Sequence, residues 1–257
     1  MFIQHDNAQF FAVSFGNNRR TLVGIGGWTG SWEVWADVFG TLSQSWRTVG
    51  IDHRGTGATT ATTDKVTIDQ MAADLLAVLD ALEIENCVLA AESSGTAVAL
   101  TAAHQQPHRF TGLILSGGLY YRPPTDASDP FLLALQRDYE TAVQTFITNC
   151  LPETDSQAMH KWARKILMRA TQTAAIDLYT ATLTLDLRPI LNQISQPTLI
   201  LHGDADRILP VDSSRWLGSQ IPQSHLHILP GAGHAPMMTF PQEVAEAINR
   251  YFPNETN

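Results

Sequence analysis

The sequence contains few cysteines and no dense cluster of positive charge. Cys87 and Cys150 are the only cysteines among 257 residues. Cys87 lies in the apolar run 86–91, where a buried free thiol is favoured over a disulfide or a nucleophile. The 16 Lys and Arg against 25 Asp and Glu give a formal net charge of −9. We expect no binding to nucleic acid or to an anionic membrane, because both attract clustered cations.

Long hydrophobic runs are also missing. No window approaches the roughly 20 apolar residues that span a bilayer, and residues 1–6 lack the cationic and apolar regions of a signal peptide. The sequence therefore predicts a cytoplasmic location. The nine histidines are scattered and form no Cys/His cluster of metal-ligand spacing. We expect neither a metal nor an organic cofactor.

Short apolar runs alternate with helical patterns over most of the chain. Strands are expected at 9–15, 21–26, 47–51, 86–91, 113–115, 197–202 and 224–229. Helices are expected from Ser31 onward and over 67–82, 96–104 and 241–252. Thr67 and Gln70 have the form of a capping box. This alternation, with its short connections, predicts an α/β fold with a mostly parallel sheet that helices cover on both faces.

The alternation stops between residues 120 and 194. Helical stretches are expected there over 130–151 and 156–173, without a convincing strand. Pro123-Pro124 marks the start of the segment and Pro189 lies near its end. The sequence therefore predicts one core, formed by residues 1–119 and 195–257, with a helical cap inserted over 120–194.

A serine stands at one predicted junction of strand and helix, in Ala91-Glu92-Ser93-Ser94-Gly95. Small residues around Ser93 permit the tight turn called a nucleophile elbow, usually written G-x-S-x-G, which exposes the hydroxyl. Ala91 replaces the first glycine of that pattern. The alternative is a serine that only caps the helix. For Glu92 two interpretations stay open: its side chain faces a polar neighbour, or it adjusts the reactivity of Ser93.

Two further polar residues follow predicted strands. His234 lies in a glycine-rich loop before the last helix, where a neutral imidazole can take up and return a proton; the alternative is a structural histidine. Asp206 follows strand 197–202, and a carboxylate there can orient His234, whereas Asp204 is interpreted as a loop-bracing residue. The order along the chain predicts the catalytic triad Ser93, Asp206 and His234.

An oxyanion hole is predicted beside this triad. Such a site needs two backbone N–H groups, one from the residue after the nucleophile and one from the loop after an early strand. Ser94 supplies the first. The strand 21–26 leads into the loop Gly26-Gly27-Trp28, and Trp28 is the candidate for the second.

Taken together, these motifs resemble those of the α/β-hydrolase superfamily, in the branch with a short helical cap. The resemblance covers nearly the whole chain and implies an eight-stranded, mostly parallel sheet with the cap above Ser93. The family's oxyanion loop usually reads His-Gly, but Gly26 takes the histidine position here, so we expect a loosened or repacked loop. Haloalkane dehalogenases and epoxide hydrolases carry an aspartate as nucleophile, so Ser93 argues against both.

The resemblance implies a serine hydrolase that cleaves an uncharged carboxylic ester or a lactone through an acyl-enzyme. The alternatives are a carbon–carbon bond hydrolase, a perhydrolase or haloperoxidase-like enzyme, and a slow-turnover ligand receptor or signalling protein. We expect an apolar small-molecule partner, and the sequence does not indicate an oligomeric state. The pocket is expected to include Gly27, Trp32, Trp162, Met237 and Met238.

Overall fold

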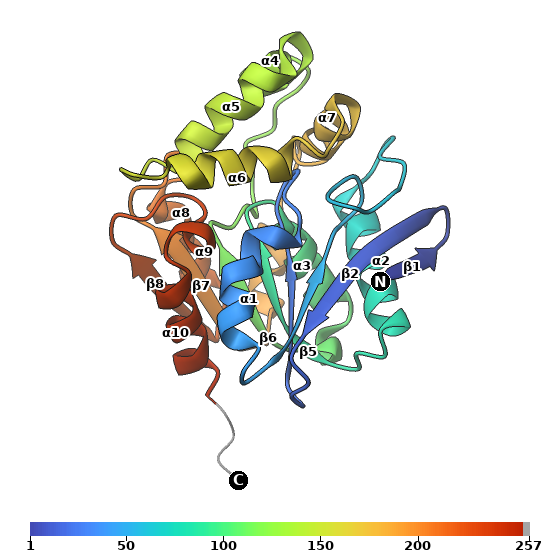
Figure 1. Cartoon of the computed structure of the whole chain (residues 1–257), viewed down its shortest axis with the longest axis vertical. Helices are drawn as coiled ribbons and strands as arrows, with labels where there is room; N and C mark the ends of the chain where they lie inside the picture. Colours follow the sequence, from blue (N-terminus) through green and yellow to red (C-terminus); the bar gives the residue numbers. More distant parts are fainter. Residues whose placement is uncertain (254–257) are drawn as a thin grey trace.

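An eight-stranded sheet forms the centre of the computed structural model, which describes residues 1–253 (Figure 1). The strand order is β1-β2-β4-β3-β5-β6-β7-β8. Only the pairs β1–β2 and β2–β4 are antiparallel, and the others are parallel. The predicted α/β fold with a mostly parallel eight-stranded sheet is confirmed. The strands are β1 (Phe2–His5), β2 (Ala8–Phe15), β3 (Thr21–Ile25), β4 (Arg47–Ile51), β5 (Cys87–Glu92), β6 (Phe110–Ser116), β7 (Thr198–Gly203) and β8 (Ser224–Leu229).

Helices cover the two faces of this sheet. On one face α1 packs against α10, and on the other α2 packs against α3 (Figure 1). Among residues 1–253, no helix is both long and apolar enough to cross a bilayer. The helices outside residues 120–180 are η1 (Trp32–Trp35), α1 (Ala36–Leu42), α2 (Ile68–Ala81), α3 (Gly95–Gln105), η2 (Pro107–Arg109), η3 (Arg188–Gln193), α8 (Val211–Gln220), α9 (Pro236–Thr239) and α10 (Pro241–Tyr251).

The central strands and the start of α2 follow the sequence pattern closely. Every residue of β5 and β7 is buried, as expected for parallel strands covered on both faces. Thr67 caps α2 by accepting the N–H of Gln70 at 3.1 Å. Cys87 is a buried free thiol, as predicted, and burial raises its pKa to about 12.

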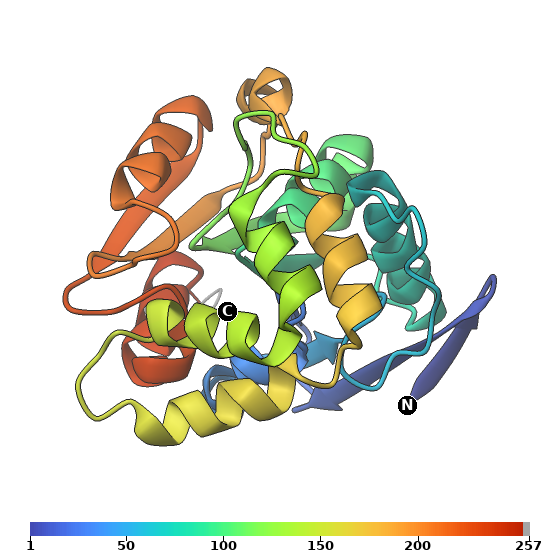
Figure 2. The same ribbon diagram turned by 90° about the horizontal axis from the view of Figure 1, so that it is seen from above.

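Four helices between β6 and β7 lie above the sheet: α4 (Pro130–Arg137), α5 (Tyr139–Cys150), α6 (Gln157–Leu167) and α7 (Gln172–Thr180). Figure 2 shows α4 beside α7, with α5 and α6 packed together. The helical stretch expected over 130–151 is divided into two helices, because Asp138 ends α4 and caps α5 by accepting the N–H of Thr141. The helix expected over 156–173 ends at Leu167. The division into a core and a cap stays a prediction.

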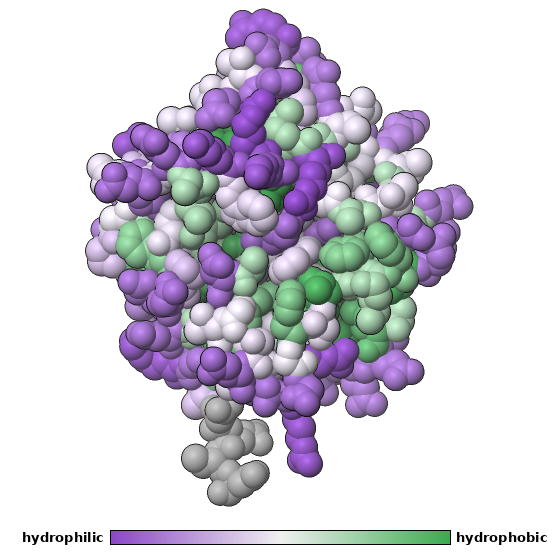
Figure 3. Space-filling model, viewed as in Figure 1, coloured by the Kyte–Doolittle hydropathy of each residue, from purple (hydrophilic) through white to green (hydrophobic). Residues whose placement is uncertain are grey.

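The edge strand β1 was not predicted, because four residues are too few to display an alternating pattern. It pairs with β2, and Phe2 packs its ring against Phe11 with the centroids 5.4 Å apart. Apolar side chains gather over this hairpin on the surface (Figure 3), where Phe2 is 56% exposed.

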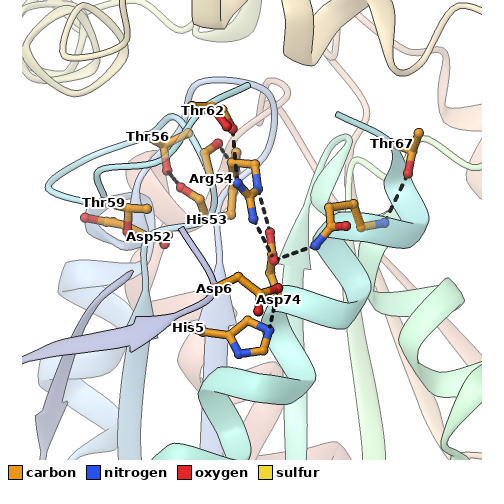
Figure 4. Close-up of polar contacts among 11 residues, drawn as sticks. His5, Asp6, Asp52, His53, Arg54, Thr56, Thr59, Thr62, Thr67 and Asp74 are labelled. Atoms are coloured by element: carbon orange, nitrogen blue, oxygen red, sulfur yellow. Dashed lines mark hydrogen bonds and ion pairs between the residues drawn. The ribbon is translucent and has the colours of Figure 1, made fainter. Parts of the chain in front are cut away.

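Buried polar groups hold the loop that follows β4 (Figure 4). Asp52 accepts the N–H groups of Trp32 and Ala58 at 2.9 and 2.8 Å. Arg54 forms two hydrogen bonds of 2.8 Å with Asp74 on α2. Both side chains of this ion pair are almost fully buried. The pair therefore ties the loop to the helix layer beneath the site.

Replacing Asp74 by alanine leaves the buried guanidinium of Arg54 without its partner. We expect the free energy of unfolding, measured by urea denaturation, to fall by about 3–5 kcal/mol. The matched control is Asp80→Ala on the same helix, because Asp80 is 68% exposed where it pairs with Arg109. That change should cost less than about 1 kcal/mol. Equal losses for the two variants would contradict the account.

Candidate active site

Ser93 occupies a sharp turn between β5 and α3, with a φ angle of +52°. This left-handed conformation is unfavourable for a residue other than glycine. Hydrogen bonds on both sides hold it: the N–H of Ser93 donates to Ser116 on β6 at 2.8 Å, and its carbonyl accepts the N–H of Leu119 at 3.0 Å. The arrangement of strand, turn and helix is the one that the serine motif predicts.

The loop after β3 approaches this turn so closely that only glycine fits. A Cβ atom on Gly27 would lie 2.8 Å from the Cβ of Ser93, and one on Gly95 would lie 2.5 Å from the carbonyl oxygen of Gly26. Within residues 1–253, the backbone N–H groups of Trp28 and Ser94 have no hydrogen-bond partner. An oxyanion hole requires two unpaired donors, so the N–H groups of Trp28 and Ser94 remain its candidates.

His234 and Asp206 form a short hydrogen bond. The Nδ1 atom of His234 lies 2.7 Å from Oδ2 of Asp206, and the backbone N–H of His234 donates to the carbonyl of Cys150 at 2.8 Å. A nitrogen that faces a carboxylate carries the proton, which leaves Nε2 as the acceptor in the neutral ring. Nε2 is buried and has no hydrogen-bond partner within the described residues 1–253.

Asp206 is itself surrounded by donors. Its Oδ1 accepts the N–H groups of Ile208 and Leu209 at 2.7 and 3.0 Å, and its Oδ2 lies 3.2 Å from Nε2 of His202. Burial alone would raise the pKa of Asp206, but the hydrogen bonds from His202 and His234 outweigh burial and lower it. The carboxylate therefore stays ionised at neutral pH.

His202 was not predicted as a site residue. It is fully buried at the end of β7, and its Nδ1 lies 2.7 Å from the hydroxyl of Ser214. Its Nε2 faces two acceptors, Asp206 and the carbonyl of Leu209, so this nitrogen carries the proton. A histidine inside an apolar strand, four residues before the predicted acid, is the signal that could have identified it.

The pKa of His234 lies above its ordinary value. Burial lowers it, but the hydrogen bond and charge of Asp206 and the charge of Glu92 outweigh burial. A base must be neutral to accept a proton, so His234 can act as a base only above this raised pKa. Any activity that uses the imidazole should be lost as the pH falls through it.

The loop around Gly27 is repacked rather than loose. His53 places its Nε2 2.9 Å from the carbonyl of Gly27, and Glu92 accepts the N–H of Gly27 on Oε2 at 2.7 Å. These two side chains brace the loop in which Gly26 stands at the family's histidine position. His53 was not predicted to take part, because a contact across 26 residues depends on the fold and leaves no local pattern.

Two pockets meet at Ser93. The first has an empty volume of about 490 Å³, and Gly27 and Met238 line it as predicted. Its other lining residues are Trp28, Gly30, Val34, Glu92, Ser93, Phe146, Ile147, Cys150, Leu151, Ala163, Ile166, Leu167 and Ala235. The second is larger, about 1080 Å³, and Trp28 and Ser93 also line it. Two cationic side chains, Arg122 and Arg207, lie in its wall.

Three residues expected in the pocket line neither space. Trp32 packs its ring against Phe15, with the two ring centroids 5.6 Å apart. Met237 is fully buried in the core. Trp162 lies on α6 and packs partly buried against the core, while Ala163, the next residue, is the one that faces the first pocket. Neighbouring residues on a helix point in different directions, and the sequence alone does not specify which one lines the cavity.

Comparison with known proteins shows the family to which the chain is related. A family model described as serine aminopeptidase, S33, matches residues 16–239. The pimeloyl-[acyl-carrier protein] methyl ester esterase of Nitrosomonas europaea is 32% identical over 242 residues, which cover 88% of this chain and 93% of the esterase.

Solved structures share the fold. A hydrolase from Pseudomonas aeruginosa PA01 matches with a TM-score of 0.91 and 23% identity over 98% of both chains. An esterase from Exiguobacterium antarcticum matches with a TM-score of 0.90 and 22% identity, over 97% of this chain and 98% of the esterase. The family model and the 32% identical esterase identify an enzyme of the α/β-hydrolase class, and the sheet has the fold of that class. The chain belongs to the serine aminopeptidase S33 family of that superfamily.

Removal of the Asp206 charge should lower the pKa of His234, because the carboxylate stabilises the imidazolium. We expect the NMR titration of the His234 ring in Asp206→Asn to shift to lower pH than in the wild type. Asp204→Asn is the matched control, since Asp204 belongs to the same loop but accepts the N–H of Gly231 instead. An equal shift in both variants, or none in Asp206→Asn, would show that the pair does not set this pKa.

Proposed function

We propose that this protein is a serine hydrolase that cleaves an uncharged carboxylic ester or a lactone, with Ser93 as nucleophile, His234 as base and Asp206 as the residue that orients the base. One observation carries the proposal: His234 is fixed by Asp206, while its unpaired Nε2 lies 3.6 Å from Oε1 of Glu92, the residue directly before Ser93. Relatives described as esterases add support.

The proposed reaction has two halves. Nε2 of His234 takes the proton of the Ser93 hydroxyl as the oxygen attacks the carbonyl carbon. The N–H groups of Trp28 and Ser94 then stabilise the oxyanion. The ester bond breaks, and the leaving alcohol receives the proton from His234. A water molecule, deprotonated by the same imidazole, attacks the acyl-enzyme and releases the acid with Ser93 restored.

The two pockets support an assignment of the two ends of the substrate. The first pocket is apolar apart from Glu92 and Ser93, which suits an acyl chain. The second holds polar groups as well, so we assign the leaving group to that side. A linear ester and a lactone both satisfy this arrangement. The cytoplasmic location expected from the sequence stays a prediction.

The hydroxyl of Ser93 should be indispensable. We expect wild-type protein to hydrolyse p-nitrophenyl esters, from acetate to decanoate, with sustained turnover. In Ser93→Ala, kcat should fall by more than about 10⁴-fold, because the nucleophile is lost. Full activity in Ser93→Ala would refute the proposed function. A single slow burst with a retained acyl group in the wild type would instead favour the receptor alternative.

The apolar pocket should determine the acyl length. Ala163→Leu on α6 fills part of it, so we expect kcat/KM for the octanoate ester, relative to acetate, to fall by about tenfold. Ala158→Leu is the matched control, because Ala158 lies on the same helix but is exposed. If both variants keep the wild-type chain-length profile, the acyl chain does not enter this pocket.

A further inference from the structure

Glu92 connects the two halves of the site. It is the last residue of β5, directly before Ser93, and its side chain is buried. One carboxylate oxygen, Oε2, accepts the N–H of Gly27 at 2.7 Å. The other, Oε1, lies 3.6 Å from Nε2 of His234. The carboxylate therefore contacts the oxyanion loop on one side and, on the other, approaches the nitrogen that would take the serine proton.

The surroundings of Glu92 offer little else that could compensate a charge. It is the only carboxylate among the residues that line the apolar pocket. Burial raises the pKa of Glu92, the charge of His234 and the N–H of Gly27 lower it, and the charge of Asp206 raises it. The thiol of Cys150 also lines the pocket, and burial keeps that thiol protonated. His234 is thus the one nearby group that can become a cation within the described surroundings of Glu92.

A buried carboxylate is costly unless a charged or hydrogen-bonding partner compensates it. Gly27 supplies a permanent donor, whereas His234 supplies a positive charge only after it has accepted a proton. The attraction between Glu92 and His234 is therefore stronger in the transition state than in the resting site. An interaction that strengthens in this way accelerates the chemical step.

We propose that Glu92 is a positioning residue that stabilises the protonated form of His234 while it holds the oxyanion loop through Gly27, an inference that rests on the hydrolase function proposed above. The proton leaves the Ser93 hydroxyl, resides on Nε2 of His234, and passes to the leaving oxygen. While it resides there, the imidazolium ring has Asp206 at Nδ1 and Glu92 near Nε2. Glu92 neither gains nor loses a proton in this cycle.

The test is Glu92→Gln, which removes the charge and keeps an oxygen that can accept the N–H of Gly27. Without the charge, His234 holds its proton less tightly, so the acidic limb of the kcat/KM profile should move to lower pH. At the alkaline plateau, we expect kcat on p-nitrophenyl acetate to fall by about tenfold, because the imidazolium is less stabilised. Glu92→Ala, which also loses the contact with Gly27, should lose more.

Glu153→Gln is the matched control. Glu153 likewise accepts a backbone N–H, that of Gly233, at 2.7 Å next to His234, but it is not among the groups that shift the pKa of His234. Its acidic limb should stay in place. A purely structural role for Glu92 predicts the same for Glu92→Gln, so an unmoved limb in that variant overturns the proposal.

Circular dichroism first establishes that each variant folds. If Glu92→Gln does not fold, Glu92→Asp replaces it, because the shorter side chain withdraws the charge from His234; the limb should again move to lower pH, and an unmoved limb again overturns the proposal. Ser93→Ala separates the two hypotheses. If it retains full activity, the hydrolase function itself fails. If Ser93→Ala is inactive and the Glu92→Gln limb does not move, only the role of Glu92 fails.

Discussion

The left-handed backbone at Ser93 is the constraint on which the rest of the site depends. β5 and the backbone hydrogen bond to Ser116 hold that turn in place, and the turn then demands that nothing larger than glycine stand at positions 27 and 95. Within residues 1–253, the N–H groups of Trp28 and Ser94, each next in the chain to one of the residues in this close approach, have no hydrogen-bond partner. The parallel sheet thus stabilises a strained residue and, in the function proposed here, the same packing holds the donors of the oxyanion hole.

The electrostatics of the site come from two carboxylates that differ in their surroundings. Asp206 accepts four donors, from two histidines and two backbone amides, so its pKa is lowered and it remains charged. Glu92 has only Gly27 and a longer contact with His234, and its pKa is raised, chiefly by burial. Asp206 fixes the ring of His234, and Glu92 stabilises the ring when it is protonated. This division explains how one imidazole can be held rigidly and still change its protonation state.

The sheet and the turn at Ser93 could be predicted from the sequence, because apolar strands and glycine-rich turns are local patterns. The contact of His53 with Gly27 could not be predicted, since it joins segments that only the fold brings together, whereas His202 stands four residues before Asp206 and could have been identified. Trp32, Met237 and Trp162 were assigned to the pocket because they stand beside the glycine loop, after His234 and in the cap, but the direction of a side chain depends on packing. Asp138 caps α5 and so divides it from α4. The apolar spacing over 130–151 is helical throughout and does not indicate this break.

The most direct test of the central claim is covalent labelling of the nucleophile. Wild-type protein is treated with a fluorophosphonate, digested, and analysed by mass spectrometry of its peptides. We predict one phosphonyl adduct, on Ser93, because both pockets meet at this residue and it directly follows Glu92, whose Oε1 lies 3.6 Å from the unpaired Nε2 of His234. An adduct on another residue, or an unmodified protein under conditions that label a known serine esterase, would contradict it.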